Sequence, residues 1–139
     1  MSRVYLALGR EGARALRESG RVASDVRAYA VTGLVREAFP DDDVEDLEYD
    51  AFVVAAEHCP EPVLVAAADV PDRVVRPEAE VPEDEQGWRV RLEGDVPLRC
   101  IVSLHVPDPD VPPAEADSAE LLWFDVGELD ALLGDVRGA

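Results

Sequence analysis

The pattern of apolar positions is clearest in the middle of the chain, where residues 63–68 are all apolar and prolines stand at positions 62 and 71. A short run of this kind, with β-branched residues at its start, is typical of a β-strand that is covered on both faces. Proline is tolerated at the ends of strands and not within them, so the two prolines fit the strand boundaries. We therefore predict a central strand here, with the rest of the fold arranged on its two sides.

Before this run, strand-like and helix-like patterns alternate along the chain. The longest helical pattern has a broad apolar stripe, acids in its first turn that favour the positive end of the helix dipole, and Pro60 just beyond its end. A shorter helix ends before Gly20, a residue type common at helix C-termini. In order, the pattern predicts a strand at 4–8, a helix at 11–19, a strand at 26–32, one or two helical turns at 34–39 and a helix from 41–43 to about 58.

After the central run, strand patterns and polar loops dominate. Residues 88–92 alternate strictly between apolar and basic side chains, which predicts a half-exposed strand. In order, the remaining elements are an extended piece at 74–76, a loop at 77–87, the strand at 88–92, a longer strand within 96–106, a loop at 107–118, a strand at 121–124 and a closing helix that begins near Asp125. Both loops are rich in proline and acids, and we expect them to be solvated and mobile.

This order of elements predicts one α+β domain over residues 1–139, with a mixed, partly antiparallel sheet and three to four helices. The helices between the early strands would allow crossovers and parallel pairing in the first half of the chain. The second half, with its short loops, favours antiparallel hairpins.

The charge balance narrows the classes of partner. The chain has 31 acids, 13 basic residues and a formal net charge of −18. Nucleic acids and anionic membranes bind clusters of basic side chains, so both are unfavourable partners. A basic protein partner is the partner that this charge favours.

Location and redox state follow from what the sequence lacks. The apolar residues after Arg3 are too few for a signal peptide, and no apolar run has the length of a membrane span. Cys59 and Cys100 do not have C-x-x-C spacing, and we expect reduced thiols in a cytoplasmic protein. The sequence indicates no particular oligomeric state.

Two groups of residues resemble metal ligands without matching a known site. The acids at 41–43, 45 and 46 lack the spacing and the glycine of a calcium loop, and capping of a helix explains them. His58 and Cys59 are adjacent, while Cys100 and His105 differ by an odd number and would lie on opposite faces of a regular strand. The sequence therefore predicts no metal, no cofactor and no catalytic residue.

One arrangement suggests a ligand site. The first two strands and their margins carry a cluster of aromatic and basic side chains that could line one cleft for a nucleotide or another anionic ligand. The competing interpretation, which the residue types favour, is that the two tyrosine rings pack in the core with their hydroxyls at the surface. The candidate ligand-binding residues are Arg3, Tyr5, Tyr29, Thr32 and Arg36.

Several segments resemble a small uncharacterised actinobacterial family, a domain of unknown function. They include residues 4–6, 28–32, 63–71, 96–98 and 121–125. The order of elements is also similar to that of ADP-ribosyltransferase-like proteins, although the first two strands contain no histidine and no E-x-E pattern lies near the end of the chain. The first resemblance implies no activity, and the second implies NAD-like binding.

These observations favour a binding or interaction module over an enzyme. The alternative is an NAD-like nucleotide-binding protein, or a degenerate ADP-ribosyltransferase-like enzyme, that uses the cleft of tyrosines and arginines.

Overall fold

The structure is a computed structural model, and it describes residues 1–60, 63–78, 80–107 and 121–124. Within these residues, helices pack on a sheet whose strand order is β5-β6-β3-β1-β4-β8-β9, and β2 pairs with β7 beside it. The strands are β1 (Ser2–Ala7), β2 (Arg21–Val22), β3 (Ala28–Ala30), β4 (Val65–Val70), β5 (Val75–Pro77), β6 (Arg89–Leu92), β7 (Val96–Pro97), β8 (Ile101–Pro107) and β9 (Leu121–Phe124). The predicted α+β class is confirmed.

The central strand is where the apolar run predicted it. β4 lies between β1 and β8, and alternate side chains of β4 enter two different hydrophobic clusters. Ala66 and Ala68 face α1, β2 and β7, whereas Val65 and Ala67 face α3. Both faces of β4 are therefore covered, which is why its sequence is continuously apolar rather than alternating.

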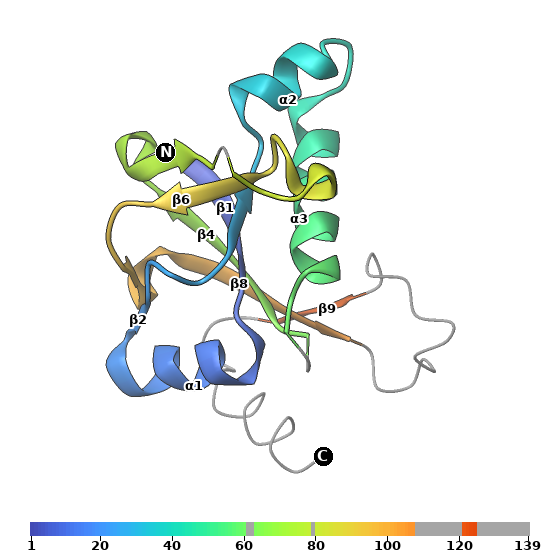
Figure 1. The fold of residues 1–139 in the computed structure, drawn as a ribbon. Helices are drawn as coiled ribbons and strands as arrows, with labels where there is room; N and C mark the ends of the chain where they lie inside the picture. The colour runs from blue at the N-terminus through green and yellow to red at the C-terminus, as the bar shows by residue number, and fades with distance from the viewer. Residues whose placement is uncertain (61–62, 79, 108–120, 125–139) are drawn as a thin grey trace.

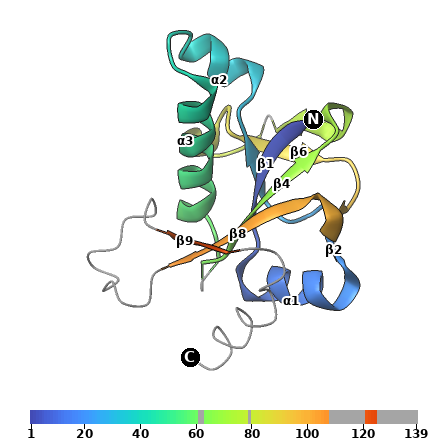
Figure 2. The ribbon, with the colours of Figure 1, turned by 180° about the vertical axis from the view of Figure 1, so that it is seen from behind.

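Three helices are described, and their ends match the sequence expectations only in part. They are α1 (Gly9–Ser19), α2 (Gly33–Ala38) and α3 (Val44–Glu57). α1 buries Ala13 and Leu16 and ends at Gly20, whose φ of 74° is left-handed. Asp43 occupies the N-cap position of α3 without a side-chain capping bond. Figures 1 and 2 show α3 beside the sheet. They also show α1 and α2 at opposite ends of the fold.

The expected parallel pairing does not occur, because every strand pair of the described residues is antiparallel. The crossover through α2 and α3 does connect two strands, β3 and β4, that run in the same direction. However, β1 lies between them and pairs with both in the opposite direction. The connection through α2 and α3 therefore links two strands that are separated by β1, rather than two adjacent strands.

Two segments of the second half differ from their predictions. The long strand expected within 96–106 is interrupted by a 3-10 turn, Leu98–Cys100, so that β7 and β8 are separate. The segment 77–87, expected to be a solvated loop, contains a second 3-10 turn, Glu83–Glu85, and the Glu85 side chain is 2% exposed. Most of the loop expected at 107–118 and the closing helix after Asp125 lie outside the described residues.

Among the described residues, no helix combines the length and the apolar character that crossing a membrane requires.

Candidate functional site

The two tyrosines of the predicted cleft pack in the core. Tyr5 and Tyr29 are direct partners in the β1–β3 register, and both side chains lie under α3. They are 8% and 0% exposed, and the Tyr5 ring meets the edge of Phe52 at 5.9 Å between centroids. Burial is the main cause that raises the pKa of Tyr5 to about 12, so its hydroxyl stays neutral. The packing interpretation therefore describes both rings, but its surface position for the hydroxyls is wrong for Tyr29, which is fully buried.

The two arginines of the predicted cleft line a separate cavity. This cavity of about 610 Å³ is bordered by Arg3 and Arg36, but also by Glu48, Asp69 and Asp72. The Arg3 guanidinium donates to both carboxylate oxygens of Asp69, from Nε at 2.5 Å and from Nη2 at 3.2 Å. The hydrogen bond to Asp69 is the main cause that raises the pKa of Arg3. Much of the positive charge of Arg3 is thus already neutralised.

Thr32 has a local structural role. It is the N-cap of α2, where its hydroxyl oxygen accepts from the Val35 N–H at 3.3 Å. The same hydroxyl donates to the Gly87 carbonyl at 2.5 Å, which ties α2 to the segment before β6. Thr32 borders a different cavity, of about 570 Å³, together with Gly87 and Arg89. The structure therefore does not gather the five predicted residues around one cleft, and a ligand for them stays a prediction.

A buried carboxylate lies next to Tyr29. The Tyr29 hydroxyl donates to Glu85 Oε1, and Arg89 Nη1 lies 3.6 Å from Glu85 Oε2. Tyr29 and Arg89 meet because β3 and β6 pair them directly. Burial and the hydrogen bond to Glu85 both raise the pKa of Tyr29, in that order. The carboxylate of Glu85 therefore has a hydrogen-bond donor and an opposite charge, as a buried acid requires.

His58 connects this carboxylate to the end of α3. Its ring stacks on Tyr29, with centroids 6.1 Å apart and planes inclined by 28°. Nδ1 lies 3.0 Å from the Val54 carbonyl oxygen, and Nε2 lies 2.9 Å from Asp84 Oδ2. Burial is the largest single influence on the pKa of His58 and lowers it, but the Val54 carbonyl, Asp84 and Glu85 together outweigh burial, and the pKa is raised.

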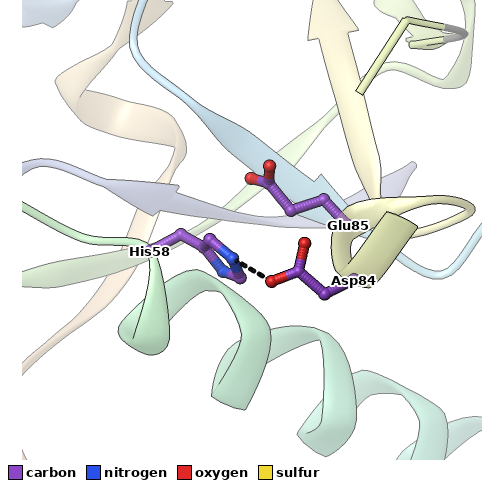
Figure 3. Close-up of side chains that lie close together, drawn as sticks. All are labelled: His58, Asp84 and Glu85. Atoms are coloured by element: carbon purple, nitrogen blue, oxygen red, sulfur yellow. Dashed lines mark hydrogen bonds and ion pairs between the residues drawn. The ribbon is translucent and has the colours of Figure 1, made fainter. Parts of the chain in front are cut away.

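His58, Asp84 and Glu85 form the only group of potential metal ligands found in the described part of the chain. Their ligand atoms all lie within 4.8 Å of one another. Figure 3 shows the imidazole facing the Asp84 carboxylate, with the Glu85 carboxylate to one side of this contact. We call these three residues the His58 cluster.

The sequence did not predict the His58 cluster. Asp84 and Glu85 lie in a segment whose composition indicated a solvated loop, and His58 was interpreted as a helix-terminal residue. The one signal available was the four-residue spacing of Glu85 and Arg89. That spacing gains meaning only once the pairing of β6 with β3 is known.

The other histidine has a different setting. Ser103 and His105 point to the same face of β8, and Ser103 Oγ lies 2.9 Å from His105 Nε2. The His105 ring packs against Phe52, and burial lowers its pKa to about 4. Ser103 is only 4% exposed, so a substrate has no access to its hydroxyl in this structure. The pair is therefore best explained as a satisfied polar contact within the core.

The outer surface of α2 and α3 combines apolar and acidic side chains. Asp46 and Asp50 are four residues apart in α3, which places them on one side of the helix, and Asp42 lies in the turn before it. Burial raises the pKa of Asp50, and so does the charge of Asp42 and Asp46. Large apolar side chains are also exposed here, and we call the whole set the α2–α3 surface: Leu34, Phe39, Asp42, Val44, Asp46, Tyr49 and Asp50.

Comparison with known proteins gives one match. A family model described as a family of unknown function (DUF6912) matches residues 2–133. No curated protein and no solved structure matches significantly. The resemblance to an uncharacterised family is confirmed, whereas actinobacterial origin and the similarity to ADP-ribosyltransferases stay predictions.

Proposed function

The chain belongs to the DUF6912 family, a family of unknown function, and we propose that it is a cytoplasmic binding module whose α2–α3 surface docks a basic protein partner. The observation that carries this proposal is the coincidence of exposed apolar side chains with closely spaced acids on one pair of helices. The overall charge of −18 supports it, because that charge attracts basic proteins over a distance.

The apolar side chains would supply the centre of the interface. Leu34 is 62% exposed, and Phe39, Val44 and Tyr49 are each close to half exposed. Protein interfaces are enriched in aromatic side chains at their centre, and burying such side chains stabilises a complex. These four exposed apolar residues all fall within residues 34–49. In the rest of the described chain, the exposed large apolar residues are Met1, Leu98 and Val102.

The acids would supply the charged rim and the selectivity. Burial and the acidic neighbours Asp42 and Asp46 raise the pKa of Asp50, so its charged form is less favoured in the free protein than that of an isolated carboxylate. A lysine or arginine of a partner would relieve the repulsion among these acids. A rim of this kind mainly accelerates association and makes binding sensitive to salt.

A synthetic amphipathic peptide of lysine and leucine is a suitable probe, with binding followed by fluorescence anisotropy. We expect the double substitution Asp46→Asn/Asp50→Asn to weaken binding about tenfold at low salt. Glu18→Gln/Asp25→Asn, which changes the net charge equally on other exposed elements, should have a much smaller effect. Equal losses for the two double variants would show that only the net charge matters and would refute the docking surface.

The apolar part of the surface needs its own comparison. Tyr49→Ser should weaken binding of the same peptide, whereas Leu98→Ser should not, although both residues are exposed in the free protein. Unchanged binding for Tyr49→Ser, in a variant whose circular dichroism shows a normal fold, would exclude Tyr49 from the interface.

A nucleotide such as NAD is the second candidate ligand, and one observation favours it. The cavity of about 610 Å³ brings together the two basic side chains Arg3 and Arg36. A nucleotide that binds the native state must raise the melting temperature. We expect NAD to raise the melting temperature through a contact with Arg36. The increase should therefore be absent in Arg36→Ala and present in Arg99→Ala. No shift with any nucleotide would eliminate this candidate.

A further inference from the structure

We propose that the His58 cluster binds a divalent transition-metal ion, with His58 Nε2 and the carboxylates of Asp84 and Glu85 as ligands. The three potential ligand atoms lie within 4.8 Å of one another. Two ligands of one tetrahedral zinc ion stand about 3.3 Å apart, because each lies about 2.0 Å from the metal. His58 Nε2 and Asp84 Oδ2 already lie 2.9 Å apart, so metal binding requires these two side chains to move toward Glu85.

The orientation of His58 suits a metal ligand. When imidazole binds a metal through one nitrogen, its other nitrogen usually donates to a carbonyl or carboxylate. Here Nδ1 is 3.0 Å from the Val54 carbonyl oxygen, which is an acceptor only. As long as this bond is present, Nδ1 therefore carries a proton, whether the ring is neutral or charged. Nε2 is then the ring nitrogen that can bind a metal ion.

The contact between His58 and Asp84 needs a positive charge. With the first ring proton on Nδ1, a neutral ring presents the Nε2 lone pair to Asp84 Oδ2 at 2.9 Å. Two lone pairs at this distance repel each other unless a cation lies between them. Either a second proton or a metal ion can fill this position, and a metal ion would bind Glu85 as well.

Glu85 is held in place for the same role. Its carboxylate is 2% exposed, and Tyr29 and Arg89 both contact it, so few alternative positions are open to it. A held ligand loses little conformational freedom when a metal binds. Arg89 reduces the negative potential, but two carboxylates and one guanidinium still leave a net negative charge for the cation.

The set of donor atoms identifies the class of metal. One imidazole nitrogen and two carboxylates are typical ligands of zinc, iron, manganese and related ions, whereas calcium and magnesium prefer oxygen alone. Three protein ligands leave one coordination position for water or a further ligand. Asp84 is 67% exposed, so this position has access to solvent.

The proposal can be tested with zinc sulfate on protein that has been treated with a chelator and dialysed. We expect saturable binding of one ion by calorimetry and an increase in melting temperature. Co²⁺ in place of zinc should give the visible absorption bands of a site with a nitrogen ligand. No saturable binding and no cobalt bands would overturn the proposal.

Substitutions locate the site. Asp84→Asn, at an exposed position, and His58→Gln should each weaken zinc binding by about tenfold or more. His105→Gln and Asp43→Asn, which change the other histidine and an acid of the 41–43 group, should leave it unchanged. Zinc binding that survives both cluster variants would place the ion elsewhere. The result is independent of the peptide experiment, because no cluster residue belongs to the α2–α3 surface.

Discussion

The Tyr29 hydroxyl donates to the Glu85 carboxylate and so joins an inner strand of the sheet to a turn 56 residues later in the chain. Tyr29 is fully buried and Glu85 nearly so. An unpaired carboxylate in such a position is strongly destabilising, so the contact allows an acid in the core. It also holds the segment 83–85 against β3, which is what brings Asp84 to His58.

Removing this hydroxyl should therefore cost more than an ordinary hydrogen bond. We expect Tyr29→Phe to lower the free energy of unfolding by about 2–3 kcal/mol, because it leaves the buried Glu85 oxygen without its donor. Urea denaturation followed by circular dichroism measures the change. Tyr49→Phe, which removes a hydroxyl from a side chain that is 48% exposed, should stay within about 0.5 kcal/mol of the wild type. Equal stability of the two variants would contradict the importance of the Tyr29–Glu85 contact.

The sequence predicts the parts of the fold that depend on local patterns. The apolar run at 63–68 identified the covered strand, and Gly20 identified the end of α1. Strand pairing was less accessible, because nothing local to β1 says that it lies between β3 and β4. Parallel neighbours were expected because helices separate the early strands in the sequence.

The candidate site was harder to predict than the fold. Glu85 stands in a stretch that contains a proline and five acids within residues 78–85, and composition alone assigns such a stretch to solvent. Its burial depends on two distant partners, Tyr29 and Arg89, which only the β3–β6 pairing brings together. The tyrosines were correctly associated with one another through β1 and β3, but their surroundings came from α3 and from the segment 83–85.

Thr32 provides a second test, since this predicted ligand residue also caps α2. Thr32→Val keeps the shape of the side chain and removes both the cap to Val35 and the bond to the Gly87 carbonyl. We expect a loss of about 1–2 kcal/mol in the free energy of unfolding. Thr32→Ser retains the hydroxyl and should recover most of it. A Ser variant as unstable as the Val variant would assign the effect to packing of the methyl group instead.

Two glycines with similar backbone angles should respond differently to alanine. Gly9 and Gly20 have φ values of 64° and 74°, a region that disfavours residues with a Cβ atom. A Cβ at Gly9 would also stand 3.2 Å from Pro60, whereas a Cβ at Gly20 would meet nothing within 4 Å. We expect Gly20→Ala to cost about 1 kcal/mol and Gly9→Ala to cost more, as measured by chemical denaturation. Equal costs would mean that Pro60 moves aside freely.

His105 should make the protein less stable as the pH falls from 6.5 toward 4. Burial lowers its pKa from 6.5 to about 4, so in this range the unfolded chain binds a proton that the folded protein excludes. The contribution of the neutral ring is complete above pH 6.5 and is lost as the pH falls toward the folded pKa. Because the ring is partly exposed, we expect a loss of about 1–2 kcal/mol rather than the full value implied by the shift.

The many carboxylates also titrate in this range, so the effect of His105 has to be isolated by difference. His105→Gln cannot ionise, and its amide can still bond to Ser103 Oγ, which lies 2.9 Å from Nε2 in the wild type. The unfolding free energies of wild type and His105→Gln should be compared from pH 7.5 downward. As the pH falls, the wild type should lose more stability than the variant, by the amount that His105 contributes. A difference that stays constant with pH would mean that His105 accepts a proton in the folded protein as readily as in the unfolded chain. In that case the contact of the His105 ring with Phe52 and its bond to Ser103 would persist with a charged ring, and burial would not be what sets its pKa.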